Sequence, residues 1–261
     1  SDGNRLSKET RRTNSPTYGG CVDKQIGFRR NIYLAWMDAA AAFSGETAEP
    51  LELRARLEPI VGADVASVTN RRAAIDILVN IWAKSRETYP ALREEAIALY
   101  ARSTAAADRL WLHYGMTLLT YDFFRLGGIA VGQLSRHKDA ITSREVKQRL
   151  LKEMGALGAL EYAADRVVFS LRSWGVLVDS DRRHVYTPLR QHFSASAPAL
   201  ELWMLAIALT AHPAQQLPFA DLLRLPELFP FRFQANIDDV RASSHFAVHR
   251  QGISWEMVGL A

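Results

Sequence analysis

The sequence predicts a mainly α-helical protein, and three observations support this. Apolar residues recur at helical spacing through most of the first half of the chain, and residues that cap or open helices precede several of these runs. Alternation typical of strands is confined to short segments of the second half. The chain has 261 residues, of which 48% are hydrophobic and 23% charged, so it can bury a proper core.

The first half predicts a bundle of helices joined by short breaks. The expected helices cover residues 25–43, 49–57, 71–84, 90–101 and 103–121. Asn70 is expected to cap the third helix, and Pro90 fits the first turn of the fourth. Pro59 and Gly62 are expected to follow the end of the second. Short loops between consecutive helices are typical of an all-α bundle.

The next segment predicts three helices followed by a β-hairpin. Helices are expected over 123–135, 142–154 and 156–174, and Thr142 with Glu145 forms a capping box for the second. Strand-forming valines and Tyr186 then flank a polar turn at 179–183. This order resembles a winged helix-turn-helix, whose geometry suits a helix entering the major groove of duplex DNA.

The C-terminal part predicts one apolar helix and two short strands. The helix covers 198–212, and the alternating residues Phe231/Phe233 and Phe246/Val248 could pair as strands. Trp255 and Met257 could dock a partner, but core positions are expected for them because large apolar residues are usually inside. The chain thus divides into a basic flexible arm (1–24), a helical bundle (25–122), a winged-helix-like unit (123–190) and a C-terminal helix with short strands packing on the core (191–261).

The distribution of charge favours a nucleic-acid partner more than the net charge of +4 does. Residues 136–190 carry 11 basic and 7 acidic side chains, and residues 1–30 carry 7 and 3. The side chains expected to contact DNA lie on the two helices and the hairpin tip: Arg144, Lys147, Arg149, Lys152, Tyr162, Arg166, Arg172, Arg182 and Arg183. Grouped cations of this kind suit a phosphate backbone, so double-stranded DNA is expected to be bound with little sequence preference. Arg11, Arg12, Arg29 and Arg30 are expected to help.

A protein-binding role stays open beside the DNA hypothesis. Glu161 and Asp165 lie on the helix expected to enter the groove, where acids repel phosphate, and the alternative for Phe169 on its outer face is packing against the bundle. Winged helices also serve as protein-binding modules. The alternative is an adaptor that assembles other proteins through exposed aromatic residues such as Phe169 and Trp255.

Enzymatic, metal and cofactor motifs were sought and none was found, so we expect a protein that is not an enzyme and has no cofactor. The sequence holds no phosphate-binding glycine loop, no nucleophile elbow and no zinc motif. His113 is expected to form a hydrogen bond locally within the bundle, and Gly127-Gly128 to mark close helix packing. No run reaches the ~20 apolar residues of a membrane span. A single cysteine, Cys21, and the absence of a secretory signal predict a reducing compartment, the cytoplasm.

Three stretches resemble the BrxA family of bacterial BREX phage-exclusion systems. They are LHYGMTLLTYDFF (112–124), RVVFSLRSWGVL (166–177) and VHRQGISWEMV (248–258), within a resemblance that spans roughly residues 70–258. The resemblance implies a mostly helical, non-enzymatic protein with a fold similar to the NusB-type bundle. It also implies a double-stranded DNA-binding accessory component of an antiviral defence operon, working with other BREX proteins and conferring phage resistance.

Overall fold

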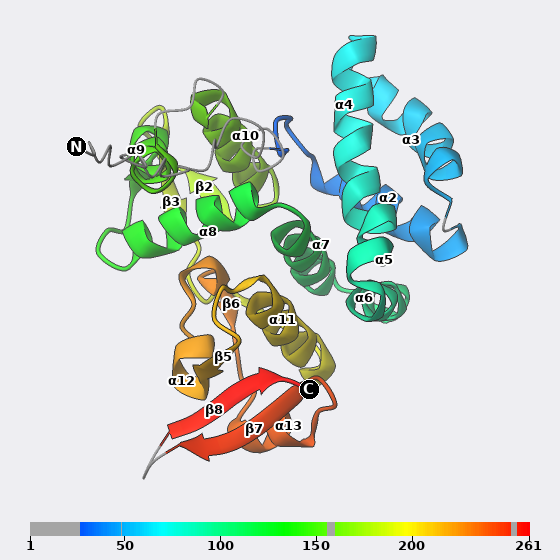
Figure 1. Cartoon of the computed structure of the whole chain (residues 1–261). Coiled ribbons are helices and arrows are strands. Elements are labelled where there is room, and N and C mark those ends of the chain that lie inside the picture. Colours follow the sequence, from blue (N-terminus) through cyan, green and yellow to red (C-terminus); the bar gives the residue numbers. More distant parts are fainter. Residues whose placement is uncertain (1–26, 48, 156–159, 252–254) are drawn as a thin grey trace, which may run out of the picture.

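The fold is described by a computed structural model over residues 27–47, 49–155, 160–251 and 255–261. The protein is mainly helical, as the sequence predicts, with a few short strands. Figure 1 shows α2–α6 on one side of the molecule and α8–α10 on the other, with α7 and α11 lying between them. The basic arm expected at 1–24, with Arg11 and Arg12, lies outside the described residues.

The first group of helices forms one wall of the core. It contains α2 (Leu34–Glu46), α3 (Pro50–Asp64), α4 (Val68–Val79), a π-helical turn (Asn80–Lys84), α5 (Ser85–Thr88) and α6 (Pro90–Arg102). The apolar stripe expected in the third helix is buried throughout: Ala74, Ile77, Leu78 and Ile81. Pro90 opens α6 as expected, because a proline at the first helical position lacks an N–H that would be unpaired there in any case.

Three helix ends differ from the expectation. The first helix begins at Leu34 instead of near residue 25, because Ile32 is held outside the helix by a hydrogen bond from its N–H to Ser170 Oγ, 3.2 Å away. The third is capped by Ser67 instead of Asn70, since Ser67 Oγ accepts from the Asn70 N–H at 3.4 Å. The second passes through Pro59 and continues to Asp64.

Pro59 is tolerated inside α3 because it lies on the exposed side of that helix. Leu53, Leu57 and Val61 recur at four-residue spacing and are buried, so the apolar stripe continues past the proline. Ala55, whose carbonyl loses its helical partner at Pro59, is exposed, so water can replace the missing N–H. Burial of the stripe therefore outweighs the local helix-breaking signal.

Helices α7 (Ala106–Thr120) and α11 (Pro198–Ala211) form the centre of the core. Trp203 of α11 packs so closely on α7 that a Cβ at Gly115 would lie 2.6 Å from its ring. The indole of Trp203 also donates to the Leu92 carbonyl at 2.9 Å, which ties α11 to α6. The expected helix at 198–212 is therefore confirmed, and it is buried almost all round.

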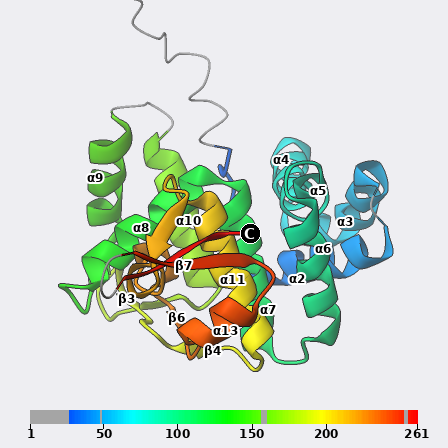
Figure 2. The same cartoon turned by 60° about the horizontal axis from the view of Figure 1, so that its bottom comes forward.

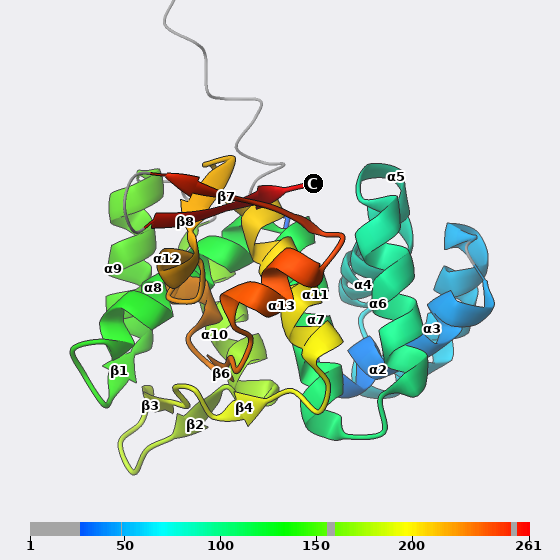
Figure 3. The ribbon, with the colours of Figure 1, turned by 90° about the horizontal axis from the view of Figure 1, so that it is seen from below.

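Residues 122–188 fold into three helices and a three-stranded antiparallel sheet. The elements in order are α8 (Asp122–Ser135), β1 (Ile141–Thr142), α9 (Ser143–Met154), α10 (Leu160–Ser173), β2 (Leu177–Asp179) and β3 (Val185–Pro188), with strand order β1-β3-β2. The capping box at Thr142 and Glu145 is present, and Gly155 ends α9 with a φ of +80°. The β2–β3 hairpin projects at the edge of the molecule away from α3 and α4 (Figure 3).

A glycine-rich face of α8 allows two neighbours to approach its backbone. A Cβ at Gly127 would lie 2.6 Å from Val167 of α10, and a Cβ at Gly132 would overlap the carbonyl oxygen of Pro226. Pro226 opens a short 3-10 turn (Pro226–Leu228) that lies directly on α8. Close packing is therefore the role of the Gly127-Gly128 pair and of Gly132, as expected for the first two.

The strand pairing expected in the C-terminal part is wrong. The elements are β4 (Phe193–Ser194), β5 (Gln216–Pro218), α12 (Phe219–Leu222), β6 (Phe231–Arg232), α13 (Ile237–Ala242), β7 (Phe246–Gln251) and β8 (Trp255–Leu260). Strand β6 pairs with β4, and β7 pairs with β8. The ring of Phe231 lies 4.3 Å from Trp111 and 5.0 Å from Tyr114, which holds β6 against α7 and away from β7.

Trp255 was expected in the core, and it is 55% exposed. Strand β8 contacts α11, and β7 contacts α13 (Figure 2). Val258 is the fully buried residue of β8. Because side chains alternate along a strand, Trp255 lies on the face opposite to Val258 and turns outward.

Candidate nucleic-acid interface

The N-terminus of α9 and the tip of the β2–β3 hairpin meet at one corner of the molecule. Thr142 pairs with Val185, and the Ser143 N–H donates to the His184 carbonyl at 3.4 Å. Arg144 follows Ser143, and Arg182 and Arg183 precede His184, so these three cations lie around one junction. All three are exposed. We call Arg144, Arg182 and Arg183 the basic corner.

The hairpin tip is held by its own backbone and by a serine. The Ser180 N–H donates to the Val185 carbonyl at 3.0 Å, and Ser180 Oγ accepts from the Arg182 N–H at 3.2 Å. His184 has a φ of +61°, a conformation that histidine adopts more readily than most residues. This ordering fixes the backbone that carries Arg182 and Arg183.

Two of the expected DNA contacts are ion-paired with acids of the same unit. Lys147 Nζ lies 2.8 Å from Asp165 Oδ2, which joins α9 to α10. Arg172 Nε lies 2.8 Å from Asp179 Oδ2, which joins α10 to β2. In each pair the carboxylate offsets the charge of the cation. The positive charge of the surface expected to contact DNA is therefore interrupted between the helices.

Two further expected contacts make neutral hydrogen bonds. Arg149 donates to Gln133 Oε1 of α8 at 2.9 Å, and Arg166 donates to Asn31 Oδ1 at 3.1 Å. These guanidinium groups keep their charge. They are half-buried and oriented by other parts of the chain.

The outer face of α10 is partly covered by the segment before α2. Tyr33 stacks edge-on against Phe169 with ring centroids 5.3 Å apart, and the Trp174 indole donates to the Ile32 carbonyl at 2.9 Å. Arg29 and Arg30 lie just before this segment. Tyr162 of α10 is 73% exposed, and Lys152 is exposed in the last turn of α9. The accessible part of the expected surface is therefore the basic corner with Lys152 and Tyr162.

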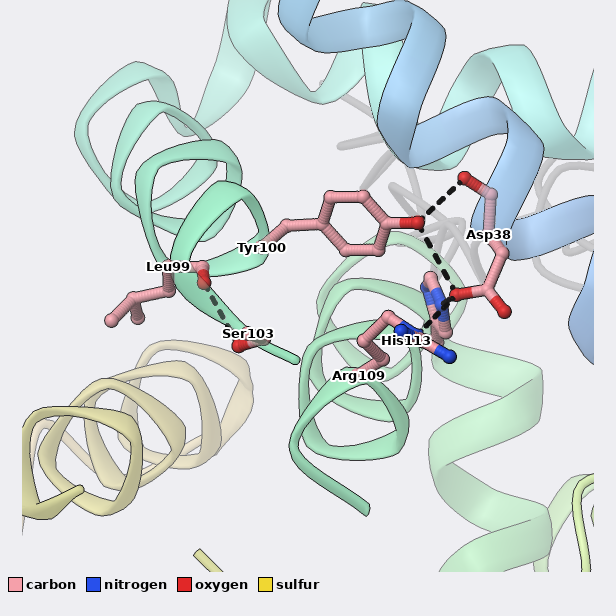
Figure 4. Close-up of polar contacts among 6 residues, drawn as sticks. All are labelled: Asp38, Leu99, Tyr100, Ser103, Arg109 and His113. Atoms are coloured by element: carbon pink, nitrogen blue, oxygen red, sulfur yellow. Dashed lines mark hydrogen bonds and ion pairs between the residues drawn. The ribbon is translucent and has the colours of Figure 1, made fainter. Parts of the chain in front are cut away.

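A buried polar cluster forms a second candidate site. His113 Nε2 lies 2.9 Å from Asp38 Oδ1, and Arg109 Nε lies 3.1 Å from the same oxygen (Figure 4). The Tyr100 hydroxyl donates to the Asp38 carbonyl at 3.0 Å. The cluster thus joins α2, α6 and α7. The partner of His113 lies within the helical bundle, as the sequence predicts, but it is 75 residues away in sequence, so no spacing rule identifies it as Asp38.

Burial sets the protonation states of this cluster. It lowers the pKa of His113, so the imidazole is neutral, donates from Nε2 to Asp38 and leaves Nδ1 without a partner among the described residues. Burial alone would raise the pKa of Asp38, but the hydrogen bond from His113 and the charge of Arg109 bring that pKa below its usual value. Burial also raises the pKa of Tyr100 to about 12.

The cluster is better suited to holding helices together than to catalysis. The His113 ring is fully buried, with the Trp82 ring 5.5 Å from it. A general base must reach the proton that it removes from a substrate, and this imidazole is enclosed. Two histidines near the C-terminus lie apart from this cluster: His245 contacts Glu95 at 3.0 Å, and His249 is exposed in β7.

Two kinds of feature are absent from the residues that the structure describes. In that part of the chain, no group of three or more His, Cys, Asp or Glu side chains could hold a metal ion. No helix there is long and apolar enough to cross a membrane.

No family model, curated protein or solved structure matches this chain. The resemblance to the BrxA family therefore rests on the three sequence stretches given above.

Proposed function

We propose that this protein binds double-stranded DNA through the basic corner, with Lys152 and Tyr162 at the edge of the contact. The observation that carries the proposal is the junction of β1–α9 with the hairpin tip, which brings Arg144 beside Arg182 and Arg183. Exposed guanidinium groups on an ordered backbone suit phosphate oxygens, to which arginine can donate two parallel hydrogen bonds.

The topology of residues 122–188 supports the same proposal. The order of three helices and three strands, with β3 between β1 and β2, supports the winged helix-turn-helix that the sequence predicts. In that arrangement α10 would be the helix presented to the groove and the hairpin would be the wing. Phe169 is covered, and Lys147 is paired with Asp165, so the contact is restricted to the first turns of α10. We therefore expect the protein to contact mainly the backbone of the duplex and not the base edges.

The biological setting of the proposal comes from the resemblance to the BrxA family. It suggests a non-enzymatic, cytoplasmic accessory protein of a BREX phage-defence system, with a NusB-like bundle attached to the DNA-binding unit. The other BREX proteins would then be its protein partners.

The test is fluorescence anisotropy with a labelled duplex over a salt series from roughly 50 to 300 mM. If Arg144, Lys152, Arg182 and Arg183 each neutralise one phosphate, log affinity should fall against log salt with a slope of about −3.6. Arg182→Gln should reduce that slope by about 0.9. Arg72→Gln, on an exposed residue of α4 far from the hairpin (Figure 3), should leave it unchanged. Binding without salt dependence, or without loss in Arg182→Gln, would exclude this interface.

The exposure of Trp255 favours a second candidate, the protein adaptor. Its ring lies on the outer face of β8, where it is 55% exposed. Pull-down of operon partners should be lost in Trp255→Ser and retained in the Arg144→Gln/Arg182→Gln double variant if the protein is an adaptor. If the DNA proposal is correct, duplex binding should be lost in the Arg144→Gln/Arg182→Gln double variant and retained in Trp255→Ser.

A further inference from the structure

Three arginines surround a cavity on the side of α8 where the turn at 226–228 packs. The cavity has a volume of about 380 Å³ and lies between the end of α8 and residues 223–231. Its arginines come from separate parts of the chain: Arg136 follows α8, Arg190 follows β3, and Arg224 follows α12. None of the three belongs to the basic corner.

Backbone carbonyls hold two of these arginines in place. Arg190 donates to the Ser135 carbonyl at 2.5 Å, and Arg136 donates to the Arg224 carbonyl at 2.6 Å. A carbonyl orients a guanidinium group without neutralising it. In the part of the chain that the structure describes, Asp139 is the acid paired with one of the three, at 2.8 Å from Arg190. Three guanidinium groups less one carboxylate leave a charge of +2 around the opening.

Apart from the arginines, Ser135 and Gln191, the side chains that line the cavity are apolar. Leu228 and Phe231 are buried in its floor, and Leu225 and Phe229 are partly exposed in its walls. Glu227, between two lining residues, is 1% exposed, and its carboxylate lies 3.9 Å from Arg125 Nη1, which offsets its charge. The cavity thus offers a cationic mouth and an apolar interior, within the range of about 300–1,000 Å³ typical of small-molecule sites.

We propose that this cavity binds an organic phosphomonoester, with the phosphate at the arginines and a flat or apolar body inside. A phosphomonoester carries about −1.5 to −2 charges near pH 7, which matches the +2 of the mouth better than a carboxylate or a phosphodiester does. Arginine also fits phosphate oxygens with paired N–H donors. The source can be a free nucleotide or the 5′-phosphate of a DNA end, and both present the same group.

The test is isothermal titration calorimetry of the full chain with dAMP, deoxyadenosine and inorganic phosphate. We expect dAMP to bind at one site, and the two part-ligands to bind at least about tenfold more weakly, because each lacks one half of the contact. Arg224→Gln should weaken dAMP binding by about tenfold or more, since a charged hydrogen bond to the phosphate is lost. Arg224→Lys, which keeps the charge without the paired donors, should lie between.

Further measurements distinguish the two sources of the phosphate and test the DNA-binding proposal and the cavity proposal independently. A duplex carrying 5′-phosphates that loses affinity in Arg224→Gln, while a 5′-hydroxyl duplex does not, identifies a DNA end. Arg182→Gln should leave dAMP binding unchanged, and Arg224→Gln should leave the salt slope of binding to the 5′-hydroxyl duplex unchanged, so either proposal can fail alone. Absence of Arg224-dependent binding of both dAMP and the 5′-phosphorylated duplex at millimolar concentration, in variants folded by circular dichroism, would overturn the site.

Discussion

At the residue scale, acidic partners decide which cations can reach a ligand. Lys147 and Arg172 look equivalent to Arg144 and Arg182 in the sequence, yet each of the first two lies 2.8 Å from a carboxylate. Asp165 and Asp179 were visible as charges, but which cation each one would pair with depends on how α9, α10 and β2 pack. The number of basic residues in the segment therefore overstates the number of cations available to DNA.

The Lys147–Asp165 pair gives the first prediction. Asp165→Asn removes a negative charge and frees Lys147, so we expect duplex DNA to bind about two- to fivefold more tightly, the scale of a surface ion pair. Anisotropy at low salt measures this. Asp238→Asn, which breaks the exposed Arg241–Asp238 pair on α13, is the matched control and should have no effect. A weaker or unchanged affinity in Asp165→Asn would mean that Lys147 lies outside the contact.

The buried His113 gives a prediction of pH dependence. Its pKa in the folded protein is lower than the ordinary value of 6.5, so the unfolded chain takes up the proton first as pH falls. Stability should be full above about pH 6.5 and decline as the pH falls through it. Asp38, whose pKa is also lowered, adds a further loss near and below its ordinary value of 3.8.

Urea unfolding at about pH 7.5, 6 and 5 measures the acid decline. In His113→Gln, which keeps an N–H donor for Asp38, the decline that begins near pH 6.5 should be largely lost. His249→Gln, at an exposed position of β7, should keep it. An identical pH profile in the wild type and His113→Gln would contradict the assignment.

At the element scale, apolar spacing predicted most helices, and tertiary partners decided where they end. The spacing placed α4, α6, α7 and α8 correctly, because one buried stripe per helix is enough to specify helical structure. The start of α2 could not be predicted, since residues 27–33 are extended along α10, more than 130 residues later in sequence. A local pattern carries no information about such a partner.

The glycine face of α8 gives a prediction at this scale. Gly→Ala inside a helix usually stabilises it by about 0.5–1 kcal/mol. At Gly132 the added Cβ would overlap the Pro226 carbonyl, so we expect Gly132→Ala to destabilise the protein by about 1–3 kcal/mol. Thermal and urea unfolding measure the change.

The control for this substitution is Gly45→Ala near the end of α2. A Cβ there would lie 3.6 Å from Ile97, an ordinary contact, so the effect should be neutral or slightly favourable. Equal effects at the two glycines would refute the close approach of the 226–228 turn to α8.

At the scale of the whole molecule, the C-terminal part completes the core of the N-terminal helices. Trp203 fills the space above Gly115, Phe231 lies against Trp111, and Glu201 accepts hydrogen bonds at 2.7 Å from the N–H groups of Gln234 and Ala235. The bundle predicted at 25–122 is thus packed against residues far outside that range.

Removing residues 198–261 should therefore prevent folding of the remainder. Helix α11 alone buries Leu200, Trp203, Met204, Leu205, Ile207 and Leu209. At about 1.5–3 kcal/mol for each side chain, the six together contribute about 9–18 kcal/mol, which is comparable with the typical margin of about 5–15 kcal/mol by which a domain is stable. We expect the shortened chain to lose near-ultraviolet circular dichroism and cooperative unfolding. A cooperative transition in residues 1–197 would show that the N-terminal part has a core of its own.

The sequence by itself determined the mainly helical class, the position of most helices, the capping box of α9 and the hairpin turn, because each depends on residues within a few positions of one another. Only the tertiary structure decided the pairing of Phe231, the outward position of Trp255, the partner of His113 and the neutralisation of Lys147 and Arg172. These depend on which distant segments come into contact. Burial of apolar area drives those contacts, and the spacing of residues within one segment does not identify the partner.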